Sequence, residues 1–386
     1  MGGKRTVRQT QAHTAQRQRS KMQPSDTRPS WVGLRAVSPS LCVEVTMRRS
    51  PVVPGRRRSF CAGAGGCLLA ALALAHGAVG AAEAKKTVRI GVTKIVGHPA
   101  LDAAERGFEV ALASAGFKEG VNVVYDRHNA QGDLARAETI ARQLVADKVD
   151  LIHAIATPTA QTVIKTRTEI PVVFSSITNP IQANIVPRGS ASGGKTGNNV
   201  TGVSDPWPVR LQLETYSRFV PQARKWGTIY NPAEANSVSH VQAMREAAKS
   251  LGLELVEVTA SNAAEVELAA KSLGGKVHAI NITSDNTSVA HFEAIARVCN
   301  QSQIPLFAGD VDSVSKGAIA AYGMDYFLVG YSAGKKAALV LKGVKAGDIP
   351  WGPVEKFSLV VNPSAARLQG VRISEELRKR ADKVLD

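Results

Sequence analysis

The strongest constraint on the fold is a regular alternation that begins at Lys85 and continues through most of the chain. Short apolar stretches, each as long as a buried strand, are separated by longer stretches whose apolar residues recur at helical spacing. This alternation predicts parallel sheets with helices on both faces, an α/β fold. In the first part we expect strands at 88–92, 121–125, 151–155 and 172–174, and helices at 99–115, at 134–145 and from Pro158 onward.

A second series of the same kind follows a loop rich in Gly, Ser and Asn at 189–199. Two series of similar length predict two doubly wound lobes. After them come one more helix, at 326–341, and one more strand, at 356–361, which indicate that the chain crosses back near Gly323 and again near Pro350. We therefore expect lobes of 85–204 plus 323–349 and of 205–322 plus 350–386. The expected elements of the second series are strands at 226–230, 253–258, 277–282, 305–307 and 318–322, and helices at 236–251, 263–273 and 289–299.

The formal net charge of +16 is concentrated near the N-terminus. Residues 1–60 hold 13 Lys and Arg against two acidic residues, whereas the chain from Lys85 onward carries a net charge of only +6. A basic surface for nucleic acid would need its charge on the folded body. We therefore expect no nucleic-acid partner.

The segment 47–84 has the order of an export signal. Arginines at 56–58 precede a Gly/Ala-rich apolar run at 61–75, and small residues near Ala82–Lys85 offer a cleavage site. Arg57-Arg58-Ser59-Phe60 resembles the twin-arginine address, although an ordinary secretory signal remains open. We expect a cleaved signal and a periplasmic protein, with 1–46 a disordered or mis-annotated extension.

The expected mature chain carries little that suggests catalysis. Of four cysteines only Cys299 follows the cleavage site, within an apolar helical pattern that makes it a core residue. There is no Gly-x-Gly-x-x-Gly turn, P-loop or Gly-x-Ser-x-Gly elbow, and the histidines form no pair at metal-ligand spacing. We expect no catalytic residue, no metal and no cofactor.

Polar residues gather where the expected strands end. In open α/β sheets these ends face the ligand site. Hydroxyl groups and free helix amides suit a carboxylate, and Asp or Asn suits an ammonium group, so we expect a small zwitterion or carboxylate, foremost an amino acid. The same residue types also cap helices, and for each residue alone this alternative stays open. The candidate ligand-binding residues are Thr93, His98, Asp102, Thr157, Pro158, Ser175, Ser204, Asp205, Asn231, Asn236, Ser237, Thr283, Asp285 and Asp310.

Two tryptophans also follow expected crossings between the lobes. Trp207 and Trp351 could line the cleft or pack in the hinge or core, and both interpretations stay open.

Several of these motifs together resemble the ABC transporter substrate-binding protein family related to the tryptophan/tyrosine-type uptake binding proteins. They are 88–93, 98–102, 156–161, 199–205 and 230–237, and the similarity extends from about Lys85 to Val361. The resemblance implies a type I periplasmic-binding-protein fold, with two lobes, three crossovers and a ligand cleft between them. Some members bind aromatic amino acids. The loop at 189–198 is longer than is usual in the family.

These observations favour an exported, monomeric binding protein that delivers a small ligand to an ABC transporter permease in the membrane. A ligand-sensing partner of a membrane receptor would use the same cleft, and the sequence does not separate the two. An exported α/β enzyme is less favoured because no nucleophile and base are paired.

Overall fold

The computed structural model describes residues 87–385, which fold into two α/β lobes. The expected extension at 1–46 and the expected signal peptide at 47–84 lie outside the described residues. No helix in the described part is both long and apolar enough to cross a bilayer.

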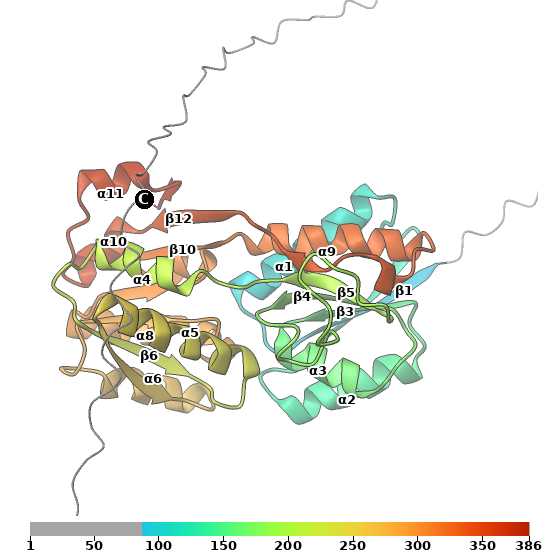
Figure 1. The fold of residues 1–386 in the computed structure, drawn as a ribbon, viewed down its shortest axis with the longest axis horizontal. Coiled ribbons are helices and arrows are strands. Elements are labelled where there is room, and N and C mark those ends of the chain that lie inside the picture. Colours follow the sequence, from blue (N-terminus) through green and yellow to red (C-terminus); the bar gives the residue numbers. More distant parts are fainter. Residues whose placement is uncertain (1–86, 386) are drawn as a thin grey trace, which may run out of the picture. The chain divides into compact units, whose positions relative to one another are not determined.

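The first lobe is built on a six-stranded parallel sheet in the order β11-β5-β4-β3-β1-β2 (Figure 1). Helices α1 and α9 pack together on one face, and α2 and α3 pack together on the other. The central strands β3, β4 and β5 are buried along their whole length, as expected for parallel strands covered by helices on both faces. The elements are β1 (Val88–Lys94), α1 (Pro99–Ser114), β2 (Val123–Asn129), α2 (Leu134–Ala146), β3 (Leu151–Ile155), α3 (Thr157–Lys165), β4 (Val172–Ile177), β5 (Val200–Ser204), α9 (Tyr326–Leu341), the 3₁₀ turn η2 (Ala346–Asp348) and β11 (Gly352–Pro353).

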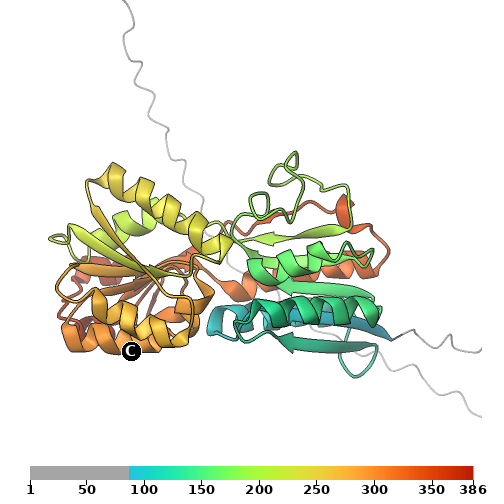
Figure 2. The same cartoon turned by 90° about the horizontal axis from the view of Figure 1, so that it is seen from below.

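The second lobe is built on a seven-stranded sheet in the order β13-β12-β10-β9-β8-β6-β7. Its strands are parallel except for β12, which runs antiparallel to β10. Helices α4 and α5 pack together on one side, and α6 packs with α8 (Figure 2). The elements are α4 (Val209–Ser217), β6 (Lys225–Tyr230), α5 (Ala235–Leu251), β7 (Glu254–Thr259), α6 (Ala263–Ser272), β8 (Ala279–Ile282), α7 (Asn286–Ala290), α8 (Phe292–Ser302), β9 (Leu306–Ala308), the 3₁₀ helix η1 (Asp312–Lys316), β10 (Ala320–Met324), β12 (Phe357–Val361), α10 (Pro363–Leu368), α11 (Glu375–Arg380) and β13 (Lys383–Val384).

The expected fold class is confirmed, with corrections at the places where the chain changes lobe. It passes between the sheets after β5, after β10 and between β11 and β12, which gives three crossovers. The boundary at 323 was too early, because Gly323 pairs with Ser358 in the second sheet. The boundary at 350 was also too early, because Gly352 and Pro353 pair with β5 in the first sheet.

Several expected elements also differ from the structure. The strands expected at 277–282 and 318–322 begin two residues later, as β8 and β10. The strand expected at 121–125 is β2, which begins two residues later, because Val121 lies in a turn that follows Gly120 with its positive φ. The single helix expected at 289–299 is two helices, because the chain leaves helical geometry at His291, which ends α7 and precedes α8.

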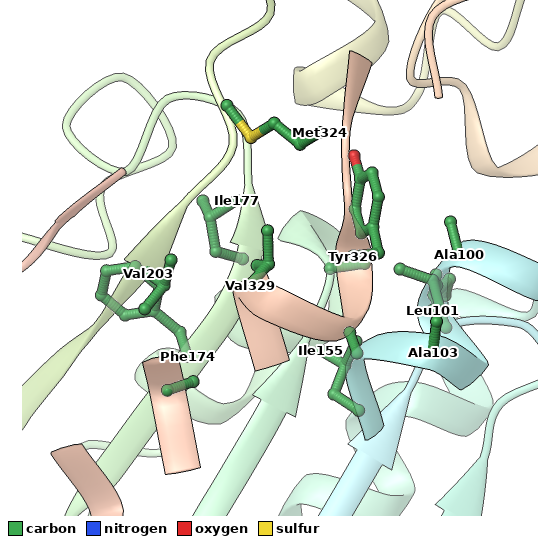
Figure 3. Close-up of a cluster of buried hydrophobic side chains, with 14 of the residues drawn as sticks. Ala100, Leu101, Ala103, Ile155, Phe174, Ile177, Val203, Met324, Tyr326 and Val329 are labelled. Carbon is green, nitrogen blue, oxygen red and sulfur yellow. The ribbon is translucent and has the colours of Figure 1, made fainter. Parts of the chain in front are cut away.

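Helix α9 enters the first lobe from the second and packs directly against α1. The contact is close because it uses glycines: a Cβ atom on Gly330 would lie 1.8 Å from the carbonyl oxygen of Ala104, and one on Gly107 would lie 2.0 Å from that of Phe327. Side chains from the first turn of α9 join those of α1, β3, β4 and β5 in one apolar cluster (Figure 3). The first turns of α1 and α9 are thereby fixed side by side.

Candidate functional site

A pocket lies where the carboxyl ends of both sheets meet. This position is the one expected for ligands of open α/β sheets. Both lobes and the segment that joins them contribute to its wall. The lining residues are His98, Ala100, Leu101, Ala156, Thr157, Ser176, Thr178 and Tyr326 from the first lobe, Asp205 and Trp207 from the joining segment, and Asn236, Ser284, Asp285, Asn286, Val289 and Asp310 from the second lobe.

The first-lobe wall presents two helix N-termini that no side chain caps. His98 precedes α1 and Ala156 precedes α3, and neither supplies a capping hydrogen bond. In both helices a proline occupies the first turn. Because the first amides of a helix have no partner within it, they can bind a negatively charged group.

Three buried polar atoms on this wall lack a hydrogen-bond partner among the described residues. They are Nδ1 of His98, Oγ1 of Thr157 and Oγ of Ser176. Burial lowers the pKa of His98 to about 4, so its ring is neutral near pH 7. Buried polar groups in folded proteins are nearly always hydrogen-bonded, so this wall is suited to a polar ligand.

The backbone of this wall is strained at two positions. Ala156 has φ +75° and Ser176 has φ +60°, a region that side chains other than glycine rarely adopt. Such conformations cost about 1–3 kcal/mol each and cluster at ligand-binding sites. Both residues line the pocket.

On the second-lobe wall, both oxygens of the Asp285 carboxylate accept hydrogen bonds from residues of the second lobe. Its Oδ2 accepts hydrogen bonds from the Asn231 amide at 2.6 Å and the Ser237 hydroxyl at 2.7 Å, and its Oδ1 accepts one from the Ser288 amide at 2.6 Å. Asp285 is therefore the N-cap of α7 and ties that helix to the ends of β6 and α5. Asn231 and Ser237 hold this carboxylate and do not line the pocket.

Glu234 is a second buried carboxylate behind this wall. It accepts hydrogen bonds from the Asn286 and Thr287 amides, each at 3.2 Å. Burial, followed by repulsion from Asp285, raises the pKa of Glu234, and burial raises that of Asp285. Asn236, whose Nδ2 donates to the Ser284 carbonyl at 2.6 Å, leaves its buried Oδ1 without a partner in this part of the chain.

Both oxygens of the Asp310 carboxylate likewise accept hydrogen bonds within the second lobe. Its Oδ1 accepts a hydrogen bond from the Ser313 amide at 2.8 Å, and its Oδ2 accepts one from the Ser313 hydroxyl at 2.7 Å. Burial raises the pKa of Asp310. These contacts hold the start of η1 against the end of β9.

Asp205 differs from the other two acidic residues that line the pocket. Its Oδ2 accepts a hydrogen bond from the Tyr326 hydroxyl at 2.6 Å, while its buried Oδ1 has no partner among the residues described. Burial raises the pKa of Asp205 to about 7. Of the three, Asp205 is the one whose carboxylate has an oxygen available for a positively charged ligand group.

The structure brings six of the fourteen predicted residues to the pocket: His98, Thr157, Asp205, Asn236, Asp285 and Asp310. Besides Asn231 and Ser237, six others lie outside its wall. Asp102 forms an ion pair with Lys94, and Ser175 pairs with Nε2 of His153 at 2.9 Å. Thr93, Pro158, Ser204 and Thr283 are buried nearby, at strand ends or, for Pro158, in the first turn of α3.

Several lining residues were not among the predicted ones. Four of them lie in the same short polar segments as predicted residues, and those segments could have pointed to them. They are Ser176, Thr178, Ser284 and Asn286. Tyr326 gave no such signal beyond its place at the start of a helix after a strand. Trp207 lines the pocket and also stacks on His240, with ring centroids 4.9 Å apart. Trp351 packs near Phe174 in the first lobe, and its Nε1 donates to the Ser190 hydroxyl at 2.6 Å.

Known proteins share both the sequence and the fold. Over 280 residues the chain is 38% identical to a tyrosine-binding protein of Clostridioides difficile, a match that covers 72% of this chain and 80% of that protein. A Streptococcus ABC domain solved in complex with L-Trp is 32% identical, with a TM-score of 0.73 over 78% of this chain and all of that one.

A third protein was solved without ligand. The open structure of a substrate binding protein with adhesive properties from Clostridium difficile is 33% identical, with a TM-score of 0.58 over 77% of this chain and 99% of that one. The model of the family described as ABC transporter substrate binding protein matches residues 89–385. The chain therefore belongs to the ABC transporter substrate-binding protein family, as the sequence motifs indicated.

Proposed function

We propose that this protein is the extracytoplasmic substrate-binding component of an ABC importer and that its ligand is an amino acid with an aromatic side chain. The related proteins described as tyrosine-binding and as a complex with L-Trp support this ligand class. The family match supports the role in transport, in which the loaded protein delivers its ligand to a permease.

The observation that carries the proposal is the convergence of unpartnered polar atoms on one pocket. Five lining residues each bury a polar atom that has no partner in the described part of the chain: His98, Thr157, Ser176, Asp205 and Asn236. An unpaired buried polar group costs roughly 1–3 kcal/mol, so a ligand that pairs several of them gains substantial affinity.

The arrangement of charge favours a zwitterion. Asp205 provides a carboxylate oxygen for an ammonium group, and the Thr157 hydroxyl with the uncapped start of α3 provides donors for a carboxylate. Apolar side chains of Leu101 and Val289, together with the Trp207 ring, line the remaining wall and suit an aromatic side chain.

The arrangement of the lobes also supports ligand capture. At nearly equal sequence identity, the TM-score is 0.73 against the protein in complex with L-Trp and 0.58 against the ligand-free, open one. Contacts across the pocket include Thr178 with Ser284, whose hydroxyl oxygens are 3.2 Å apart, and the Ser239 hydroxyl, which donates to Oε1 of Gln182 at 3.2 Å. These contacts fit a closed state, which hinge motion would open for ligand entry.

A test of the ligand class uses purified protein that has been unfolded and refolded to remove bound molecules. Its thermal stability and binding heat are measured with L-Tyr, L-Trp and L-Phe, with tyramine, which lacks the carboxylate, and with 3-(4-hydroxyphenyl)propionate, which lacks the ammonium group. A ligand at a hundred times its Kd adds about 2.7 kcal/mol to the free energy of unfolding. We expect stabilisation by at least one aromatic amino acid and at least a ten-fold loss of affinity for both truncated analogues. Equal binding of either analogue, or stabilisation by neutral sugars alone, would contradict the proposal.

The proposed location has its own test. Export from the cytoplasm predicts that the N-terminus of the extracytoplasmic protein lies near Ala82–Lys85, and N-terminal sequencing of that protein checks it. A mature protein that retained residues before Phe60 would contradict the proposed signal.

A further inference from the structure

One of the contacts between the two lobes is made by the phenol group of Tyr326. Tyr326 begins α9, which packs on α1 and the first sheet, so its ring belongs to the first lobe. Trp207 lies on the segment that joins the lobes, and its ring packs on the second lobe. There it stacks on His240 and lies over Gly309, on which a Cβ atom would come within 1.6 Å of the indole ring. The Tyr326 side chain is 3% exposed and stands beside Ala100 at the start of α1 (Figure 3).

The Tyr326 hydroxyl uses both its donor and its acceptor capacity at this junction. It donates to Oδ2 of Asp205 at 2.6 Å and accepts from Nε1 of Trp207 at 3.1 Å. Asp205 and Trp207 lie on the segment that leads from the first lobe into the second. The Asp205 carboxylate thus binds Tyr326 through Oδ2, and its Oδ1 is left for a ligand in the pocket.

We propose that Tyr326 is a positioning residue that couples ligand binding to lobe closure, by holding Asp205 for the ligand and Trp207 for the opposite wall. The inference rests on the proposed function, because it requires a ligand with a positively charged group on Asp205. A ligand on Oδ1 of Asp205 fixes the carboxylate, the carboxylate fixes the phenol, and the phenol fixes the indole of the second lobe. When the lobes separate, the hydrogen bond between Tyr326 and Trp207 is the link that must lengthen.

The role predicts a change in pH dependence that loss of packing alone would not produce. The Tyr326 hydroxyl opposes the effect of burial on the pKa of Asp205, so removal of the hydroxyl raises that pKa above its value of about 7. A ligand ammonium group needs the ionised carboxylate. The pH at which half of the maximal affinity is lost should therefore be higher in a Tyr326→Phe variant than in the wild type.

Other titratable groups lie close to Asp205, Tyr326 and Trp207. His98 lies across the pocket and His240 lies behind Trp207. Burial lowers their pKa values to about 4 and about 3, so both are neutral above pH 5.5. Asp310, which is close enough to raise the pKa of Tyr326, and Asp285 are carboxylates with raised pKa values of their own. Each has a further carboxylate close to it, Asp312 beside Asp310 and Glu234 beside Asp285, and burial raises the pKa of both to about 7. They are unchanged between wild type and variant, so the difference between the two proteins isolates Asp205.

The test compares wild type with Tyr326→Phe and with the matched control Tyr331→Phe on the same helix. The Kd values for L-Tyr and L-Trp are measured by calorimetry from pH 5.5 to pH 8.5. We expect the wild type to lose affinity about ten-fold per pH unit below pH 7, the expected slope for one required ionisation. Tyr326→Phe should bind at least ten-fold more weakly at pH 7, with its midpoint shifted upward and a smaller deficit at pH 8.5. Tyr331→Phe should match the wild type.

A mutant cycle keeps the proposal testable if Tyr326→Phe loses stability. Asp205→Asn should bind weakly with a flattened pH profile. Adding Tyr326→Phe to it should weaken binding by a clearly smaller factor than Tyr326→Phe does in the wild type, because only the support of Trp207 is then lost. Independent, multiplicative losses would overturn the proposal, as would a Tyr326→Phe protein whose affinity falls equally at every pH or does not fall at all. If the wild type binds no aromatic amino acid, the proposed function itself fails. If it binds and only the pattern of the variants disagrees, the positioning role alone fails.

Discussion

Replacement of Asp205 by Asn should stabilise the ligand-free protein at neutral pH while it weakens ligand binding. Asp205 is buried, and its pKa of about 7 lies well above the ordinary 3.8. Between these two pH values the folded state holds a proton that the unfolded state has released, so the stability of the wild type falls as the pH rises. Asparagine cannot ionise and keeps an oxygen that can accept from Tyr326.

The magnitude follows from the size of that pKa difference. One pKa unit corresponds to about 1.4 kcal/mol, so the ionisation of Asp205 costs the folded protein on the order of 4 kcal/mol by pH 8. About 3 kcal/mol of this cost falls between pH 5 and pH 8. The advantage of the Asn variant should grow by that amount over the same interval, and it should stop growing above pH 8.

Urea unfolding of ligand-stripped protein at pH 5, 6, 7 and 8 measures this difference. Because wild type and variant share every other titrating group, the difference between them reports Asp205 alone. Asp133→Asn is the matched control: Asp133 is exposed and caps α2 through the Ala135 amide at 2.8 Å, a role that Asn performs equally well. An Asp205→Asn advantage that is constant with pH would refute the reasoning, because the destabilisation would then not come from a buried charge.

Three further predictions concern the rest of the molecule. Gly330→Ala should lower the free energy of unfolding in urea by about 1–3 kcal/mol or more, because its Cβ atom would overlap the backbone of α1. As a control, Lys335→Ala on the exposed side of α9 should change that free energy by less than about 0.5 kcal/mol. Thr157→Val should weaken ligand binding by roughly two- to ten-fold without loss of stability, because its hydroxyl has no partner within residues 87–385. Thr159→Val should instead lose stability, because that hydroxyl donates to the Ala156 carbonyl at 3.0 Å. Cys299 should resist thiol reagents in the native protein and react on unfolding, as peptide mapping would show, because burial raises its pKa to about 12.

Elements with a strong periodic pattern could be predicted from the sequence, and those that depend on distant partners could not. The helix at 326–341 was located to the residue, and the structure shows why its start is sharp: the Asp325 side chain caps it. Strand β11 has two residues, Gly352 and Pro353, and exists because it pairs with β5, which no local pattern records. The break at His291 depends on the short helix that Asp285 caps.

The same distinction applies to the site. Strand-end clusters placed Thr157, Asp205 and Asp285 at the pocket because parallel strands end on one edge of a sheet. Whether such a residue caps a helix or faces a ligand depends on its hydrogen-bond partners in the fold. The sequence around Asp205 and Asp285 does not distinguish these two roles. Tyr326 was missed because its role depends on Asp205, 121 positions earlier in the chain.

The return of the chain into the first lobe has a consequence for the order of folding. The first sheet is covered by α9 and completed by β11, and both follow most of the second lobe in the sequence. The second sheet, in turn, receives β12 and β13 only after that return. A growing chain that has already made β1 to β5 therefore still exposes the apolar surface that α9 will cover, and neither half can reach its native state alone. Long-range closure of this kind slows folding and prolongs the period in which a chaperone can hold the chain.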